Sequence, residues 1–315
     1  MLIIDAARLN MEPHPLTCSA RIRLQADTVL QADGMPSEAP ASPPTLSPWE
    51  RGRNGHDEIE TSSRRMNKEG LKQRRYTLTM QANSSPIISS QHGIHAQLAA
   101  IVAKHAASTF QKPITAYNRA AFESSLATWR AAAGGDTRSM PLILDTGCGV
   151  GLSTMHLATQ FPDHFVIGVD QSADRLQRNT FWHGTTPLNF MLVRADLVDY
   201  WRLLLADRIR VARQYLLYPN PWPKAAHLGR RWHGHPVFPT IIAVGGILEC
   251  RSNWRTYIEE FAAALSQLAP AAKTEEGFSQ YFTQAPITPF ERKYLASGHA
   301  LWRYQTQLEY PPATI

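Results

Sequence analysis

The sequence predicts an α/β fold, in which a mostly parallel sheet of seven strands carries helices on both faces. Between residues 141 and 268, short apolar runs that end in a carboxylate alternate with longer runs of helical apolar spacing. This alternation is typical of strand–helix–strand units in a parallel sheet. The chain has 315 residues, of which 43% are hydrophobic. That amount is enough to bury one large core or two ordinary ones.

The first 79 residues differ from the rest in composition. Half of the positions from 34 to 55 are Pro, Gly or Ser, and no apolar periodicity runs through them. We expect residues 1–79 to be a disordered extension. Alternatively, the stretch LSPWERGRNG suggests a segment that is not native coding sequence, with the true start at Met66 or Met80. Residues 80–315 are expected to form one domain.

Composition excludes several classes of protein. The net charge of +6 favours an acidic partner. The longest weakly polar run, 239–248, is far shorter than the roughly 20 residues that span a bilayer. The N-terminus has no signal-peptide pattern, so we expect a cytoplasmic protein without a membrane partner. No cysteine pair has CxxC spacing, which argues against a disulfide framework or a zinc ribbon; the cysteines are Cys18, Cys148 and Cys250.

The elements follow one another in a simple order. Two helices, 94–107 and 120–133, lead into the first strand. Strands are then expected at 141–145, 165–170, 189–196 and 214–218, a turn with a fifth strand at 245–250, and a helix over 253–268. Two aromatic-rich runs, 278–284 and 300–310, suit a closing antiparallel pair, with a polar loop at 288–299 between them.

The turn after the first strand carries three glycines, Gly147, Gly149 and Gly151. Such a loop lets a nucleotide approach the backbone, and Asp170 follows at the distance of a ribose-binding carboxylate. The spacing is GxGxG, whereas dinucleotide folds usually show GxGxxG. Asp145 stands just before the loop, where an anion would repel a pyrophosphate and attract the ammonium group of S-adenosylmethionine. We therefore favour a methyl donor over a dinucleotide or a purely structural turn.

Asp196 is the third carboxylate at a strand end, where such folds often contact the adenine amino group. Its alternative role is to cap a helix. All three acids belong at the carboxyl edge of one parallel sheet, where open α/β sheets bind their ligands. The sequence thus indicates a Rossmann-like nucleotide site.

The stretch YPNPWPK follows the fourth strand and predicts a stiff extended loop, because each proline fixes its own φ and restrains the residue before it. The loop would hold Asn220 at the mouth of the site, beside the flat ring of Trp222. Lys224 adds a positive charge. Between Arg202 and Arg231 there are seven basic residues and one acid, Asp207.

With its histidines, this stretch suggests a phosphate-binding surface or, alternatively, an ordinary solvated face. The residues concerned are His227, Arg230, Arg231, His233 and His235. The histidines could also suggest a metal site, but no cysteine supports one and a helical HxxxH spacing is missing, so no metal is expected. Asn253 can cap the helix that follows it.

These motifs together resemble the tRNA (guanine-N7)-methyltransferase family over roughly residues 88–308. YPNPWPKAAHLGRR is similar to its F-P-D-P-W-P-K-x-R-H-x-K-R-R signature. DTGCGVG resembles its glycine loop, NWRTY its D-W-x-x-Y, and TPFE with GHALWR its T-x-F-E block and closing strand.

The resemblance implies a class I methyltransferase fold, S-adenosylmethionine as donor and a guanine in the tRNA variable loop as acceptor. It implies that Asp145, Asp170 and Asp196 line the cofactor and that Asn220 stands at the catalytic position. It further implies that the substrate contacts lie at Lys224, Asn253, Thr288, Phe290 and Glu291. The resemblance leaves open a monomer or a homodimer.

The sequence departs from the family mainly on the substrate side. Asn220 and Asn253 replace aspartates, Ala226 and Gly229 replace basic residues, and Asp145 replaces Glu. An amide accepts hydrogen bonds without the charge assistance of a carboxylate. Alternatives therefore remain: a methyltransferase for another acceptor such as an exocyclic amine, as in enzymes with an N-P-P-[FYW] loop, or a non-catalytic RNA-binding paralogue.

Overall fold

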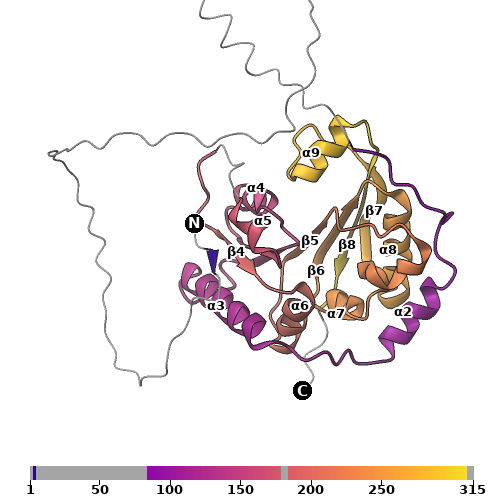
Figure 1. Ribbon diagram of the computed structural model, residues 1–315. Coiled ribbons are helices and arrows are strands. Elements are labelled where there is room, and N and C mark those ends of the chain that lie inside the picture. The colour runs from indigo at the N-terminus through magenta and orange to yellow at the C-terminus, as the bar shows by residue number, and fades with distance from the viewer. Residues whose placement is uncertain (1–2, 5–83, 179–183, 311–315) are drawn as a thin grey trace, which may run out of the picture. The chain divides into compact units, whose positions relative to one another are not determined.

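The computed structural model describes residues 3–4, 84–178 and 184–310. Apart from Ile3–Ile4, the predicted extension 1–79 lies outside the described residues, and so does the predicted domain boundary at residue 80. The described strands form one sheet (Figure 1).

The strands lie in the order β1-β4-β3-β2-β5-β6-β8-β7. All neighbours from β1 to β6 are parallel, whereas β8 runs antiparallel to both β6 and β7. The strand that leads into the glycine loop, β2, therefore lies in the middle of the sheet. Strands β3 and β4 are added on one side of it, and β5 and β6 on the other. The strands are β1 (Ile3–Ile4), β2 (Leu142–Thr146), β3 (Phe165–Asp170), β4 (Phe190–Arg194), β5 (Arg213–Leu217), β6 (Gly246–Ser252), β7 (Lys273–Tyr281) and β8 (Leu301–Leu308).

Helices cover both faces of the sheet (Figure 1). Alternate residues of β2 face opposite ways, so that Leu144 enters a large core cluster and Ile143 a smaller one. On the first face lie α2 (Leu98–Ala106), α3 (Ala116–Ala132), α6 (Leu197–Ala206), α7 (Phe238–Ala243) and α8 (Arg255–Leu268). On the second lie α4 (Leu152–Gln160), α5 (Ala173–Gln177) and α9 (Pro289–Ala296).

The predicted fold class is confirmed, with the predicted seven strands at β2 to β8 and a two-residue strand beside them. One expectation was wrong: residues 288–299 are not a polar loop throughout, because they contain α9. Thr288 caps this helix by accepting a hydrogen bond from the Glu291 N–H at 2.9 Å, and Pro289 suits its first turn. Among the described residues, no helix combines the length and apolar composition that a bilayer crossing requires.

Candidate active site

The glycine loop joins the carboxyl end of β2 to α4. Gly147, Gly149 and Gly151 all have φ between 61° and 78°, a region that favours glycine. A Cβ on Gly151 would lie 2.6 Å from Leu192 Cδ1, so this glycine also permits close packing. A Cβ on Gly149 would meet nothing within 4 Å. The loop therefore leaves open space beside Gly149, where a nucleotide can approach the backbone.

Asp145 lies at the end of β2, almost completely buried. The hydroxyls of Ser153 and Thr154 donate to its Oδ2 at 2.6 and 2.7 Å. Burial raises the pKa of this carboxyl to about 6, the two hydroxyl hydrogen bonds oppose that rise, and the nearby charge of Asp170 adds to it. Asp145 is thus bound to the first turn of α4 directly behind the glycine loop.

Asp170 connects the end of β3 to the same loop. Its Oδ2 accepts the Gly149 N–H at 3.0 Å, and its Oδ1 accepts the Ser172 N–H at 2.8 Å. Arg175 forms an ion pair with Oδ1 at 2.9 Å. The sequence did not point to this arginine, which pairs with the carboxylate that was predicted to bind a ribose.

Asp196 follows β4 and caps α6, which is the alternative role that the sequence left open. Its Oδ1 accepts the Val198 N–H at 2.8 Å, while its Oδ2 forms an ion pair with Lys112 at 3.1 Å. Asn118 bridges this site to a buried acid, since it accepts the Asp196 N–H and donates to Asp199 Oδ2 at 2.7 Å.

Lys112, Asn118 and Asp199 were also missed. The only sequence signal is Asp199 itself, an acid within the apolar run LVDYWRLLLA. A charged residue on a buried helix face needs partners, but the sequence does not show which residues supply them.

The loop after β5 is strained at two points. Tyr218 has φ +53° and Trp222 has φ +45°, although neither is glycine. Such residues cluster at functional sites and are held there by the surrounding structure. Between them Asn220 is exposed, and its Oδ1 accepts the Trp222 N–H at 3.3 Å. The loop thus presents the amide of Asn220 at the carboxyl edge of the sheet.

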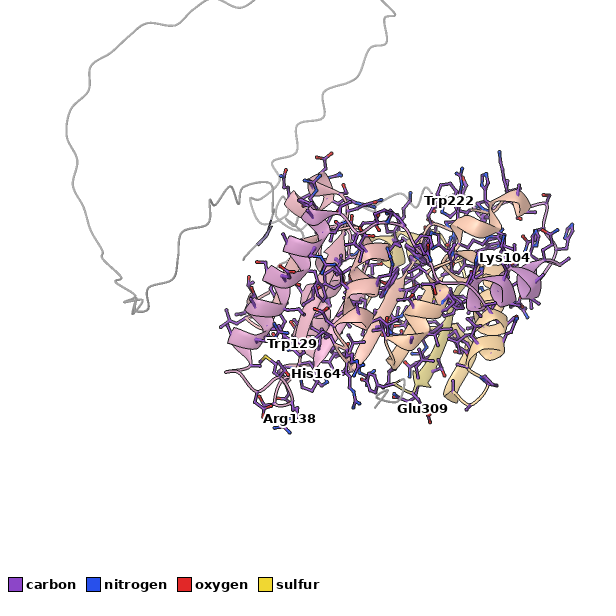
Figure 2. All side chains as sticks on the ribbon, turned by 90° about the horizontal axis from the view of Figure 1, so that it is seen from below. Lys104, Trp129, Arg138, His164, Trp222 and Glu309 are labelled. Atoms are coloured by element: carbon purple, nitrogen blue, oxygen red, sulfur yellow. The ribbon has the colours of Figure 1, made fainter. Side chains whose placement is uncertain are left out.

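Arg231 differs from its neighbour Arg230 and from Lys224, because it is buried. Its guanidinium donates to the carbonyl oxygens of Trp222 and Lys224, to Gln91 Oε1 and to Glu260 Oε2. In Figure 2, Trp222 is labelled at the top of the molecule, at the opposite end from Arg138 and Glu309. The structure therefore places Arg231 behind the loop, where it holds two of the loop carbonyls.

Glu260 is the centre of the network behind the loop. Besides Arg231, it accepts hydrogen bonds from Gln91 Nε2, the His95 N–H and His233 Nε2. Burial alone raises the pKa of this carboxyl, but the hydrogen bonds from His233 and Arg231 and the arginine charge outweigh it and lower the pKa to about 2. His233, which the sequence analysis placed on a phosphate-binding surface, is buried here.

The remaining basic residues of the loop are at the surface. Lys224 and Arg230 are exposed, and the Arg230 guanidinium lies 4.8 Å from the centroid of the Trp222 ring. The His227 ring meets the same tryptophan edge-on at 5.6 Å. Desolvation, followed by the charges of Arg230 and Lys224, lowers the pKa of His227.

The seven basic residues from 202 to 231 do not form one strip. Arg213 begins β5 and therefore lies at the opposite edge of the sheet from Lys224. There its guanidinium packs over the Phe161 ring, and that of Arg210 packs over the Tyr310 ring. The single basic surface suggested by the sequence is divided between two ends of the domain because a strand separates its members.

Asn253 does not cap α8, since Trp254 holds that position. Instead its Nδ2 lies 3.1 Å from His299 Nδ1, and His299 Nε2 lies 2.9 Å from the Ser84 carbonyl oxygen. A carbonyl only accepts, so the histidine proton is on Nε2, and Nδ1 accepts from the amide.

The predicted Thr288–Glu291 block is divided between surface and interior. Phe290 is 51% exposed and stacks on Tyr294, whereas Thr288 and Glu291 are buried. Glu291 accepts hydrogen bonds from the Tyr218 hydroxyl at 2.7 Å and from Arg251 at 2.9 Å. Glu291 therefore supports the loop through Tyr218, while Thr288 caps α9.

No group of three or more potential metal ligands occurs among the residues that the structure describes. The described site consists of backbone amides, carboxylates, amides and aromatic rings.

Residues 139–304 match the model of a family described as "Putative methyltransferase". The chain belongs to this family. It is 29% identical over 187 residues to a tRNA (guanine-N(7)-)-methyltransferase of Burkholderia vietnamiensis (strain G4 / LMG 22486), an alignment that covers 58% of this chain and 71% of the relative. It is 30% identical over 175 residues to an enzyme of the same name from Pseudomonas syringae pv. syringae (strain B728a), covering 52% and 70%.

Solved structures also resemble it. A structure described as an antibiotic related methyltransferase is 13% identical, with a TM-score of 0.43, and the match covers 64% of this chain and 97% of that chain. A 16S rRNA (adenine(1408)-N(1))-methyltransferase from Catenulisporales acidiphilia, solved with its cosubstrate SAM, is 16% identical, with a TM-score of 0.42 and coverage of 59% and 93%.

The family match and the curated relatives show that the protein is a methyltransferase, and its methyl donor is S-adenosylmethionine. The residues present fit this cofactor. The open space at Gly149 would admit a nucleotide, Asp170 would offer a carboxylate to ribose hydroxyls, and Asp196, at the next strand end, would be the partner of the adenine amino group. When bound, the cofactor supplies an electrophilic methyl group on a sulfonium.

Proposed function

We propose that this methyltransferase modifies N7 of a guanine in the variable loop of tRNA. The names of its relatives support tRNA and the N7 position, and the sequence motifs support the variable loop. By position, Asn220 and Asn253 face the guanine, and Lys224, Arg230 and Phe290 contact the surrounding RNA.

The reaction at N7 asks little proton chemistry of the protein. The N7 lone pair forms the bond to the methyl carbon as the bond from that carbon to sulfur breaks. No proton leaves, and the product base carries the positive charge. The chain has to align the nitrogen with the methyl group and exclude water. A rigid loop suits this task.

The observation that carries the proposal is the state of the groups around Asn220. The carbonyl oxygens of Trp222 and Lys224 already accept hydrogen bonds from Arg231, and that of Pro223 accepts the Ser89 hydroxyl at 2.6 Å. Glu249, Glu260 and Glu291 behind the loop are all in ion pairs. An exocyclic amine must lose a proton and needs such acceptors, whereas N7 needs none. This favours N7 over the amine.

The test is nucleoside mass spectrometry of tRNA incubated with the protein and isotopically labelled S-adenosylmethionine. We expect labelled 7-methylguanosine, which disappears when the variable-loop guanine is replaced by adenine. An Asn220→Asp variant, which restores charge-assisted hydrogen bonds to the base, should label the same nucleoside faster. Label on another nucleoside would overturn the N7 proposal. Cofactor binding by calorimetry without any labelled product would identify a non-catalytic paralogue.

A further inference from the structure

A second group of aromatic and cationic side chains lies at the same edge of the sheet, beyond Asn253. Trp302 on β8 pairs in register with Ser252, the last residue of β6 and the neighbour of Asn253. Arg255 begins α8 two residues later. Phe278 comes from β7, the last strand of the sheet. We call Arg255, Phe278 and Trp302 the β7 edge platform.

The geometry of the platform differs from that of the core. The Phe278 and Trp302 rings are parallel within 6°, with centroids 5.5 Å apart. The Arg255 guanidinium carbon lies 5.7 and 5.1 Å from those two centroids. A buried pair such as Phe238 and Phe261 is instead edge-to-face, at 73°. The platform therefore resembles a stacking surface more than a filled core.

The platform is also accessible. Phe278 is 37% exposed, and the Arg255 side chain is 60% exposed. The Arg255 ion pair with Glu259 at 2.7 Å is a surface pair one helical turn apart. Such exposed pairs are weak, because water screens both charges. Arg255 can thus exchange Glu259 for a stronger anionic partner at little cost.

The chemistry of the platform fits a nucleotide. Flat rings stack on any base, and a guanidinium binds both a base face and a phosphate. A protein partner would bring apolar side chains to a patch that offers a cation at its centre. An unpaired nucleotide satisfies the rings and the charge at once.

We propose that the β7 edge platform holds an unpaired nucleotide of the tRNA beside the one that is methylated. Its base stacks on the Phe278–Trp302 pair. Its phosphate forms an ion pair with Arg255 in place of the pair between Arg255 and Glu259. This proposal rests on the proposed function, because it assigns a further contact to the same RNA. It extends the substrate surface from the Asn220 loop across Asn253 to the outer strand of the sheet.

The test uses two exposed-site variants of the full chain, each with a matched control at the opposite edge. Phe278→Ala is compared with Leu188→Ala, which truncates a side chain that is 95% exposed. Arg255→Gln is compared with Arg138→Gln, an exposed arginine that pairs with Asp136 and lies far from Trp222 (Figure 2). Trp302 is left intact because it packs against the core.

The measurements are the Kd for tRNA at several salt concentrations and the Kd for S-adenosylmethionine. Phe278→Ala should weaken tRNA binding about fivefold or more, the loss expected for one stacked base. Arg255→Gln should reduce the salt slope by about 0.7–0.9, the value of one phosphate contact. Both variants should bind the cofactor as the parent does, and both controls should bind tRNA as the parent does.

The outcomes separate the two proposals. If tRNA is methylated at guanine N7 but both platform variants bind it like the parent, the platform proposal is wrong and the proposed function stands. If the parent binds tRNA with the predicted dependence on Phe278 and Arg255 but labels no guanine, the platform stands as an RNA-binding surface and the proposed function is wrong.

Discussion

The two halves of the active site are assembled in different ways. On the cofactor side, Asp145 is held by Ser153 and Thr154, eight and nine residues away, and Asp170 by Ser172, two residues away. On the acceptor side, Arg231 is bonded to Gln91, 140 residues away, and Tyr218 to Glu291, 73 residues away. The glycine loop and these two carboxylates are therefore made by one strand–turn–helix unit and its neighbour, and only Asp196 adds remote partners, Lys112 and Asn118.

The second half depends on segments that meet only in the complete fold. This difference teaches that the glycine loop with Asp145 and Asp170 is a local structure, whereas the acceptor loop is held by contacts from distant segments. The strain agrees with it: the left-handed residues of the cofactor loop are glycines, but those of the acceptor loop are Tyr218 and Trp222. Disturbing remote residues should therefore affect the acceptor side most.

The largest effect is expected at Arg231. Arg231→Ala removes one partner of a fully buried ion pair and leaves the Glu260 carboxylate without its cation. We expect the free energy of unfolding to fall by about 3–5 kcal/mol, as is usual when a buried pair is broken. Urea titration followed by circular dichroism measures this loss.

The matched control is the adjacent Arg230→Ala. Arg230 is exposed and contacts only the Trp222 ring among the contacts described for it. Its loss should change the unfolding free energy by less than about 0.5 kcal/mol. It should reduce the salt slope of tRNA binding by about 0.7–0.9, the value of one phosphate contact. Equal stability losses in the two variants would contradict the different placement of the two arginines.

The two halves should also respond to pH with opposite signs. The folded protein keeps a proton on Asp145 up to about pH 6, whereas the unfolded chain releases it near 3.8. Raising the pH from about 4 to 6 therefore lowers the free energy of unfolding, by on the order of 3 kcal/mol. Asp145→Asn removes this decline, so its stability relative to the parent should rise over that interval.

Glu260 has a lowered pKa of about 2 in the folded state against 4.5 when unfolded. Its contribution to stability is present above pH 4.5 and is lost as the pH falls from there towards 2. Glu260→Gln should therefore lose stability relative to the parent as the pH rises from about 2 to 4.5. Urea titrations at several pH values compare the two variants, and slopes of the same sign would refute the comparison.

Asp170 is the next test, because it belongs to the cofactor side alone. Asp170→Ala removes the carboxylate offered to the ribose, and it also frees the Gly149 N–H. We expect S-adenosylmethionine binding to weaken by roughly 1.5–3 kcal/mol, the value of hydrogen bonds to a charged group. Calorimetry measures it, with the exposed Asp174→Ala in α5 as control. The Kd for tRNA measured without cofactor should not change.

The same contrast explains what the sequence predicted. The strands, the glycine loop and the three strand-end carboxylates follow from local patterns of apolar spacing and turn residues, and the structure places them as expected. The antiparallel pairing of β7 with β8 also agrees with the two alternating aromatic runs. These features need few contacts between distant parts of the chain.

The sequence could not show which polar residues are buried together. Arg230 and Arg231 are identical neighbours, yet one faces solvent and the other faces Glu260, which sits on the apolar side of α8. Nor could spacing reveal that Glu291 accepts the Tyr218 hydroxyl, or that Asn253 pairs with His299 instead of capping α8. Such choices depend on contacts between 46 and 140 residues apart.

The smallest expected effect tests the support of the strained loop by Glu291. Tyr218→Phe removes the hydroxyl that donates to Glu291 Oε1 and keeps the ring against Tyr294. Glu291 retains Arg251 and the Ile287 N–H, so the unfolding free energy should fall by only about 1 kcal/mol. Because Tyr218 holds a left-handed conformation next to Pro219 and Asn220, kcat for tRNA should fall while the Kd for S-adenosylmethionine stays constant. A Tyr304→Phe variant removes a hydroxyl from β8, away from the loop, and should keep the parent kcat. If Tyr218→Phe also keeps it, the loop holds its own conformation, and the acceptor side is as local as the cofactor side.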